Sequence, residues 1–189
     1  DLYRADTTGR ELNEMTVGVV GYGKIGTRLV KILQAFGCRI LVNDPYVQLD
    51  PFDIAAGVEQ VSLEMLLEQS DVVTLHPRVS HETTQMINKN TLAKMKSEAL
   101  LVNTARGPLC NYDDLYKALK NGIIGSAMLE TFSIEPTPPD WPLLKLDNVT
   151  LTPHIAGASV RTAQYAAQVL AADVKNYISG LPLVNLCRS

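Results

Sequence analysis

Apolar residues follow two patterns that alternate along the chain. Short runs rich in β-branched residues predict strands that are covered on both faces. Between these runs, apolar residues recur every three or four positions, which predicts helices with one buried face. The runs that predict strands span residues 17–20, 39–43, 58–61, 71–75, 99–102, 123–129 and 149–151.

Helices are expected between these runs, near residues 25–36, 62–68, 89–95, 111–121 and 160–179. Ser62 and Asn111 are favourable N-caps for two of them, because their side chains can accept hydrogen bonds from the first turn. Gly122 and Gly180 stand where helices are expected to stop. The passage over 45–57 holds two prolines and a glycine, which argues against a long element there.

Strands that alternate with helices predict right-handed βαβ crossovers. The expected fold class is α/β, a doubly wound parallel sheet with helices on both faces. Ligands of such sheets bind at the carboxyl ends of the strands. That rule selects the loops over 21–26, 44–46, 76–83, 103–110, 130–136 and 153–158.

The first predicted strand runs directly into a glycine-rich turn, GYGKIG. Gly21, Gly23 and Gly26 have the spacing that allows a tight turn, close approach of a pyrophosphate and close packing of a helix. Lys24 and Ile25 would open that helix, whose first N–H groups attract a phosphate. The glycine spacing alone is a weak signal. Flanked by a strand, a helix and a second strand, it predicts dinucleotide binding.

Asp44 ends the second predicted strand, eighteen residues after Gly26. A carboxylate there would accept hydrogen bonds from the ribose hydroxyls and repel a 2′-phosphate, which favours NAD over NADP. The simpler interpretation is an aspartate that caps its own turn before Pro45.

Composition places the chain among ordinary globular domains. Of its 189 residues, 46% are hydrophobic and 20% are charged, and the net charge is −3. Without a basic cluster we expect neither nucleic acid nor a membrane surface as a partner. We expect residues 1–15 to be a lead-in or linker and residues 16–189 to form one dinucleotide-binding domain.

The three cysteines are Cys38, Cys110 and Cys187, an odd and widely spaced set. Such a set predicts no disulfide framework and no metal site, and it favours a reducing, cytoplasmic compartment. No apolar run reaches membrane-spanning length and no signal peptide is recognisable. Because the first residue is Asp1 and the first methionine is Met15, we expect a fragment, an excised domain or a processed product.

Three of the selected loops carry groups suited to hydride transfer. Oxidation of an alcohol by a nicotinamide needs a base for the hydroxyl proton, and His154 suits that role near neutral pH. Glu135 would orient the imidazole, and Arg106 would grip a substrate carboxylate and polarise its carbonyl. Taken singly, each has a simpler explanation: a loop hydrogen bond, a solvated turn or a surface cation.

At this point the sequence resembles a known family. The segments GYGKIG, HETTQMIN, NTARG, LETFSIEP and NVTLTPHIAGAS follow one another as in NAD-dependent D-isomer-specific 2-hydroxyacid dehydrogenases. The resemblance extends over about residues 12–184. It implies a Rossmann domain that binds NAD and acts on a 2-hydroxy acid or 2-keto acid.

The resemblance assigns Arg106 to substrate binding, Glu135 to the carboxylate paired with the catalytic histidine, and His154 to the acid/base. We expect the cofactor to be lined by Gly21, Gly23, Lys24, Ile25, Gly26, Asp44, His76, Pro77, Thr83, Thr104, Ala105, Arg106, Glu130, His154, Ala156 and Gly157. Glu130 stands where the family usually has aspartate. Arg78 departs from a common H-x-P-L pattern, and it either adds a cation near the ligand or faces water.

The resemblance also implies a second, substrate-binding domain, which we expect to be absent from this chain. We therefore expect the chain alone to bind NAD but to turn over poorly, because closure over the nicotinamide needs both walls. The resemblance implies a homodimer. Since transcriptional corepressors exist in this family, the alternative is a non-catalytic NAD-sensing module.

Overall fold

The computed structural model describes residues 9–185, so part of the expected lead-in, 1–8, and Cys187 lie outside the described residues. The chain forms two compact units, one through Pro153 and one from His154 onward. Each unit is described by itself. Among the described residues, no helix combines the length and the apolar content that a membrane span requires.

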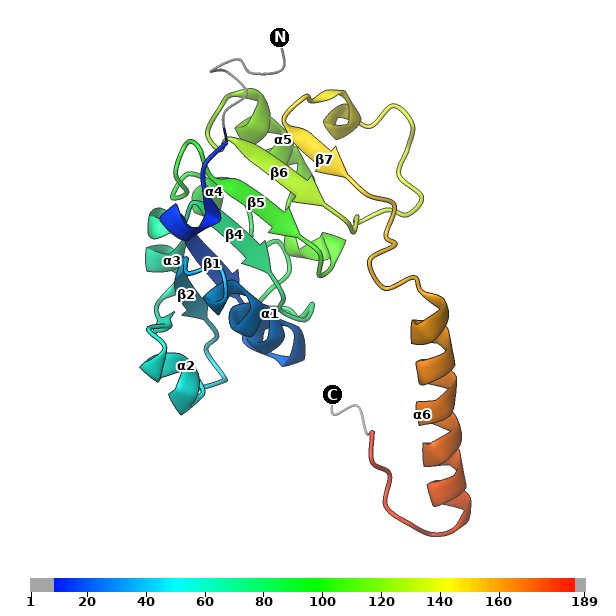
Figure 1. Cartoon of the computed structure of the whole chain (residues 1–189). Coiled ribbons are helices and arrows are strands. Elements are labelled where there is room, and N and C mark those ends of the chain that lie inside the picture. The colour runs from blue at the N-terminus through cyan, green and yellow to red at the C-terminus, as the bar shows by residue number, and fades with distance from the viewer. Residues whose placement is uncertain (1–8, 186–189) are drawn as a thin grey trace. The chain divides into compact units, whose positions relative to one another are not determined.

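The first unit is built on one parallel sheet of seven strands in the order β3-β2-β1-β4-β5-β6-β7 (Figure 1). Neighbouring strands pair in parallel throughout. The strands are β1 (Thr16–Val20), β2 (Arg39–Asn43), β3 (Glu59–Gln60), β4 (Val72–Leu75), β5 (Leu100–Asn103), β6 (Ser126–Leu129) and β7 (Val149–Leu151). This sheet confirms the predicted doubly wound α/β fold. The strand order reverses between β1 and β4, the position where such sheets bind ligands.

Both faces of the sheet are covered, which explains the uninterrupted apolar runs. Along β1, Val17 and Val19 belong to one hydrophobic cluster, whereas Val20 belongs to the other. Val30 of α1 (Lys24–Gln34) lies in the first cluster and Leu66 of α3 (Leu63–Gln69) in the second, so helices pack on opposite faces. The helices of this unit are α1 (Lys24–Gln34), α2 (Pro51–Ala55), α3 (Leu63–Gln69), α4 (Lys89–Leu92) and α5 (Tyr112–Lys120), with 3₁₀ turns at Leu12–Glu14, Gly107–Leu109 and Pro142–Lys145.

The predicted N-caps are present. The Ser62 hydroxyl accepts a hydrogen bond from the Met65 N–H at 3.2 Å, and the Asn111 side chain accepts one from Asp114 at 3.1 Å. The second unit consists of the segment from His154 and helix α6 (Val160–Ile178), which buries none of its residues.

Two boundaries differ from the prediction by three residues. Strand β6 begins at Ser126 rather than at residue 123, because the Ile123 N–H closes the end of α5 on the Ala118 carbonyl (2.8 Å). Helix α4 stops at Leu92, and the chain continues in tighter i→i+3 turns. The turn-rich passage holds no long element, as expected: its helix α2 has five residues, with Asp50 as the N-cap and proline in the first turn.

Candidate cofactor-binding and active site

The glycine turn joins β1 to α1 at the switch point of the sheet. Gly21 has φ +90°, and a Cβ on it would lie 2.8 Å from the Pro77 nitrogen. A Cβ on Gly26 would lie 2.0 Å from the Gly21 carbonyl oxygen. The fold itself therefore requires these two glycines.

Gly23 differs from Gly21 and Gly26, because a Cβ on Gly23 would meet no atom within 4 Å. It is the N-cap of α1, and no side chain caps the helix, which starts at Lys24 and continues with Ile25. The open side of Gly23 and the uncapped N–H groups together form a cradle that fits a pyrophosphate. The described residues thus fit the dinucleotide cofactor that the sequence predicts.

Asp44 lies beside this turn, at the end of β2. Its Oδ2 accepts a hydrogen bond from the Tyr22 N–H (2.8 Å), and its Oδ1 accepts from Tyr46 (2.9 Å) and Val47 (3.1 Å). The carboxylate therefore caps its own turn and is also tied to the glycine turn. A carboxylate has about four acceptor positions, so these bonds leave room for a ribose hydroxyl.

The loop after β4 closes the other side of the switch point. The His76 N–H donates to the Val20 carbonyl (2.8 Å), and its Nε2 lies 2.9 Å from the Thr74 hydroxyl. The Thr83 hydroxyl donates to the Arg78 carbonyl (2.6 Å), so it shapes the loop, while the Arg78 side chain is exposed. Across the switch point, the Tyr46 hydroxyl donates to Glu82 and links this loop to the turn after β2.

Burial lowers the pKa of His76 to about 4, so its imidazole is neutral at neutral pH. The unfolded chain takes up this proton near the ordinary pKa of about 6.5, well before the folded chain does. The free energy of unfolding should therefore fall by up to about 3 kcal/mol as the pH drops from about 6.5 to about 4. Urea unfolding of the wild type and of His76→Gln at pH 7 and pH 4.5 measures this contribution.

The His76→Gln variant should lose less stability than the wild type between the two pH values. His81→Gln is the matched control, since His81 is exposed on the same loop. If the wild type and His76→Gln lose equal amounts of stability, His76 does not cause the loss of stability in acid.

Asn103, fully buried at the end of β5, shapes the loop that carries Arg106. Its amide donates to the Arg106 carbonyl (3.0 Å), and its carbonyl accepts from the Ala105 N–H (3.1 Å). The Arg106 guanidinium is exposed and donates to the Ala105 carbonyl (2.7 Å), with half-buried Thr104 before it. The sequence alone did not single out Asn103 as the residue that shapes this loop. The available signal was a polar residue at the end of a buried strand.

The loops after β5 and β6 touch backbone to backbone. A Cβ on Gly107 would lie 2.0 Å from the carbonyl carbon of Phe132. Glu130 is buried at the start of the second loop, and its N–H donates to the Asn103 carbonyl (3.0 Å). Farther along, Glu135 is exposed and accepts a hydrogen bond from the Phe132 N–H (2.8 Å). The loops carrying Arg106 and Glu135 are thus neighbours.

An aromatic group supports the loop after β6. The ring of Trp141 packs edge-on against Tyr112 and Phe132, with centroid separations of 5.1 Å and 5.6 Å. The Tyr112 hydroxyl donates to the Thr131 carbonyl (2.8 Å). Burial raises the pKa of Tyr112, so the hydroxyl remains a donor at working pH.

His154, Ala156 and Gly157 belong to the second unit. His154 is exposed and has φ +53°, a left-handed conformation that is uncommon for a residue other than glycine. Such conformations occur often at functional sites. The pairing of His154 with Glu135 stays a prediction.

Comparison with known proteins identifies the family. The model of the D-isomer specific 2-hydroxyacid dehydrogenase, NAD binding domain, matches residues 2–156. Over 92% of its length, the chain is 42% identical to a glyoxylate reductase of Thermofilum pendens, of which it covers 51%. Over 94%, it is 41% identical to a D-3-phosphoglycerate dehydrogenase of Archaeoglobus fulgidus, of which it covers 33%.

The solved structures agree. A D-lactate dehydrogenase of Aquifex aeolicus, complexed with NAD and lactic acid, superposes with a TM-score of 0.86 at 33% identity. The match covers 94% of this chain and 57% of that one, and the chain spans a third to a half of the two curated relatives above. The chain therefore belongs to the D-isomer specific 2-hydroxyacid dehydrogenase family and comprises its NAD binding domain.

Proposed function

We propose that this chain is the cofactor-binding part of an enzyme that transfers hydride between NAD and a D-2-hydroxy acid or its 2-keto acid. The observation that carries the proposal is the position of Asp44. Its carboxylate is hydrogen-bonded to the glycine turn through Tyr22, where it favours a ribose diol over a 2′-phosphate. The relatives named above act on small 2-oxo or 2-hydroxy acids according to their names.

The proposed cofactor site follows the carboxyl edge of the sheet. The N-terminus of α1 at Lys24 and Ile25 would hold the pyrophosphate, since its N–H groups have no side-chain cap. The loops after β4, β5 and β6 would line the remaining length of the dinucleotide. The other residues of this proposed lining are Gly21, Gly23, Gly26, His76, Pro77, Thr83, Thr104, Ala105, Arg106, Glu130, His154, Ala156 and Gly157.

In the proposed mechanism, bound NAD supplies the hydride acceptor or donor. Arg106 holds the substrate carboxylate through its planar fork of donors and stabilises charge that develops on the carbonyl oxygen. His154 takes the hydroxyl proton during oxidation and returns it during reduction. Glu135 orients the imidazole and favours its protonated form.

The proposed active site needs a second wall that faces this domain. The chain spans about half or less of the relatives it matches, so we infer that further residues supply the second wall of the cleft. The chain alone is then expected to bind NADH but to turn over slowly, because water exclusion needs both walls. We further propose a homodimer in the cytoplasm, a reducing compartment that suits the free thiols of Cys38 and Cys110.

The test of the proposal is Asp44→Ala. Loss of a charge-assisted hydrogen bond to the ribose should weaken NADH binding about 10- to 100-fold. Binding of NADPH should weaken less or improve, because the repulsion of its 2′-phosphate disappears. Titration of NADH and NADPH fluorescence measures both dissociation constants.

Two further variants separate binding from folding. Asp44→Asn keeps an acceptor for the turn while it removes the charge. Glu98→Ala is the control, because it removes an exposed carboxylate just before β5, on the side of the sheet where the strands begin and away from the proposed site. Unchanged NADH affinity in both Asp44 variants would contradict the assigned role of Asp44.

A further inference from the structure

A buried carboxylate on α2 connects two parts of the cofactor-binding turn. Asp53 is 2% exposed, and no lysine or arginine forms an ion pair with it among residues 9–185. Its Oδ2 accepts a hydrogen bond from the Tyr22 hydroxyl, and its Oδ1 accepts one from the Gln34 amide (2.9 Å). Burial of a carboxylate is costly unless hydrogen bonds replace its water. The position of Asp53 therefore depends on Tyr22 and Gln34.

Tyr22 is the residue through which this network reaches the ligand side. Tyr22 is 4% exposed and its ring is anchored at the hydroxyl, while its backbone N–H donates to Asp44 Oδ2 (2.8 Å). Burial and the hydrogen bond to Asp53 raise the pKa of Tyr22 to about 12, so the hydroxyl stays protonated at working pH. A ring fixed at both ends limits how far the peptide between Gly21 and Tyr22 can rotate. The direction of the N–H that holds Asp44 is fixed with it.

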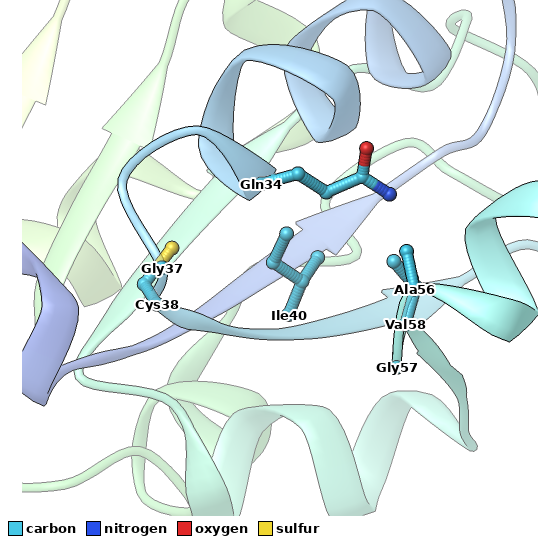
Figure 2. A pocket seen from close by; sticks show the side chains of 7 residues that line it. All are labelled: Gln34, Gly37, Cys38, Ile40, Ala56, Gly57 and Val58. Atoms are coloured by element: carbon cyan, nitrogen blue, oxygen red, sulfur yellow. The ribbon is translucent and has the colours of Figure 1, made fainter.

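Gln34 extends the network to the far end of α1. It is the last residue of that helix and lines a pocket of about 230 Å³ with Cys38, Ile40 and the segment over 56–58 (Figure 2). A pocket beside Gln34 provides little packing to hold its amide. The hydrogen bond to Asp53 supplies that constraint instead. Asp53, on α2, is thus hydrogen-bonded both to Tyr22, just before α1, and to Gln34, at the end of α1.

We propose that Tyr22, Asp53 and Gln34 form a positioning network that sets the affinity of the site for NADH and its preference for NADH over NADPH, by holding Asp44. This inference rests on the proposed role of Asp44. None of the three side chains needs to contact the cofactor. They act through the backbone N–H of Tyr22.

The first test is Tyr22→Phe in the full chain, which removes one hydroxyl and keeps the ring. Energetic coupling through such networks predicts NADH binding weakened by about three- to thirtyfold. The preference for NADH, expressed as the ratio of the NADPH and NADH dissociation constants, should fall with it. Tyr116→Phe on α5 is the matched control and should leave both constants unchanged.

A double-mutant cycle shows whether the network acts through Asp44. Tyr22→Phe combined with Asp44→Asn should bind NADH no more weakly than Asp44→Asn alone. Tyr22→Phe with Asp53→Ala removes the buried carboxylate together with its donor. This double variant should have a higher melting temperature than Tyr22→Phe alone but should bind NADH no more tightly. It therefore keeps the test valid if Tyr22→Phe alone folds poorly.

The outcomes separate the two proposals. If Tyr22→Phe lowers the melting temperature but leaves both dissociation constants unchanged, the network is only structural and the inference is overturned. Additive effects of Tyr22→Phe and Asp44→Asn would also overturn it, while the role of Asp44 would stand. If Asp44→Asn and Asp44→Ala both leave NADH affinity unchanged, the role of Asp44 fails, and the network inference fails with it.

Discussion

Replacement of His154 by alanine is expected to lower kcat by about 10²- to 10⁴-fold, the usual contribution of a positioned general acid/base. The NADH dissociation constant should change little, because the proposed role of the imidazole is proton transfer. The measurement is steady-state reduction of a panel of 2-keto acids with NADH and NADPH. It should use a polypeptide that also holds the proposed second wall of the cleft, since the chain alone is expected to turn over slowly.

Glu135→Gln is the companion variant. It keeps the size of the side chain and removes its charge, so it should shift the pH profile of kcat more than it changes NADH affinity. Equal and modest losses in His154→Ala and Asp44→Ala would argue against the separate roles assigned to them. If the wild type reduces no 2-keto acid but binds a partner in an NADH-dependent way, the NAD-sensing module is the better function.

The glycines of the turn should respond to alanine in opposite ways. A Cβ on Gly26 would lie 2.0 Å from a backbone oxygen that cannot move without breaking the turn. Gly26→Ala is therefore expected to destabilise the domain by about 3–5 kcal/mol. Gly23→Ala should cost less, about 1 kcal/mol, because its Cβ meets open space, although alanine is a poorer N-cap than glycine.

Gly23→Ala should nonetheless weaken NADH binding by about tenfold or more, because the added methyl group occupies the approach of the pyrophosphate. Urea unfolding and NADH titration of both variants measure the two effects. The pair serves as its own control, one residue for folding and the other for binding. A Gly23→Ala protein with normal NADH affinity would contradict the assigned cradle.

The fold was predictable because the apolar runs reflect a physical constraint: a parallel strand covered on both faces has apolar residues at successive positions. Val17 and Val20 illustrate this, since they face different clusters. Boundaries were less predictable. Ile123 has the composition of a strand residue, but its N–H is used to end α5, a choice that depends on hydrogen bonds outside the local pattern.

The same distinction applies to the site. The places of Gly21, Gly26 and Asp44 around the turn after β1 were predictable from spacing within one βαβ unit. The positions of Asn103 and Asp53 were not, because each depends on hydrogen-bond partners that the fold brings close. Asp53 lies 31 residues from Tyr22 in sequence and hydrogen-bonds to it. The catalytic pair of Glu135 and His154 remains a prediction from motif resemblance.

The contact between Gly107 and Phe132 limits how the loops after β5 and β6 could be altered. With no room for even a methyl group between the two backbones, neither loop can change its path unless the other changes too. We therefore expect that segments 103–110 and 130–136 can be replaced by those of a relative only together. In a chimera with a relative of different substrate preference, both segments should be replaced at once. A single replaced segment would clash with the backbone of the other, unchanged loop.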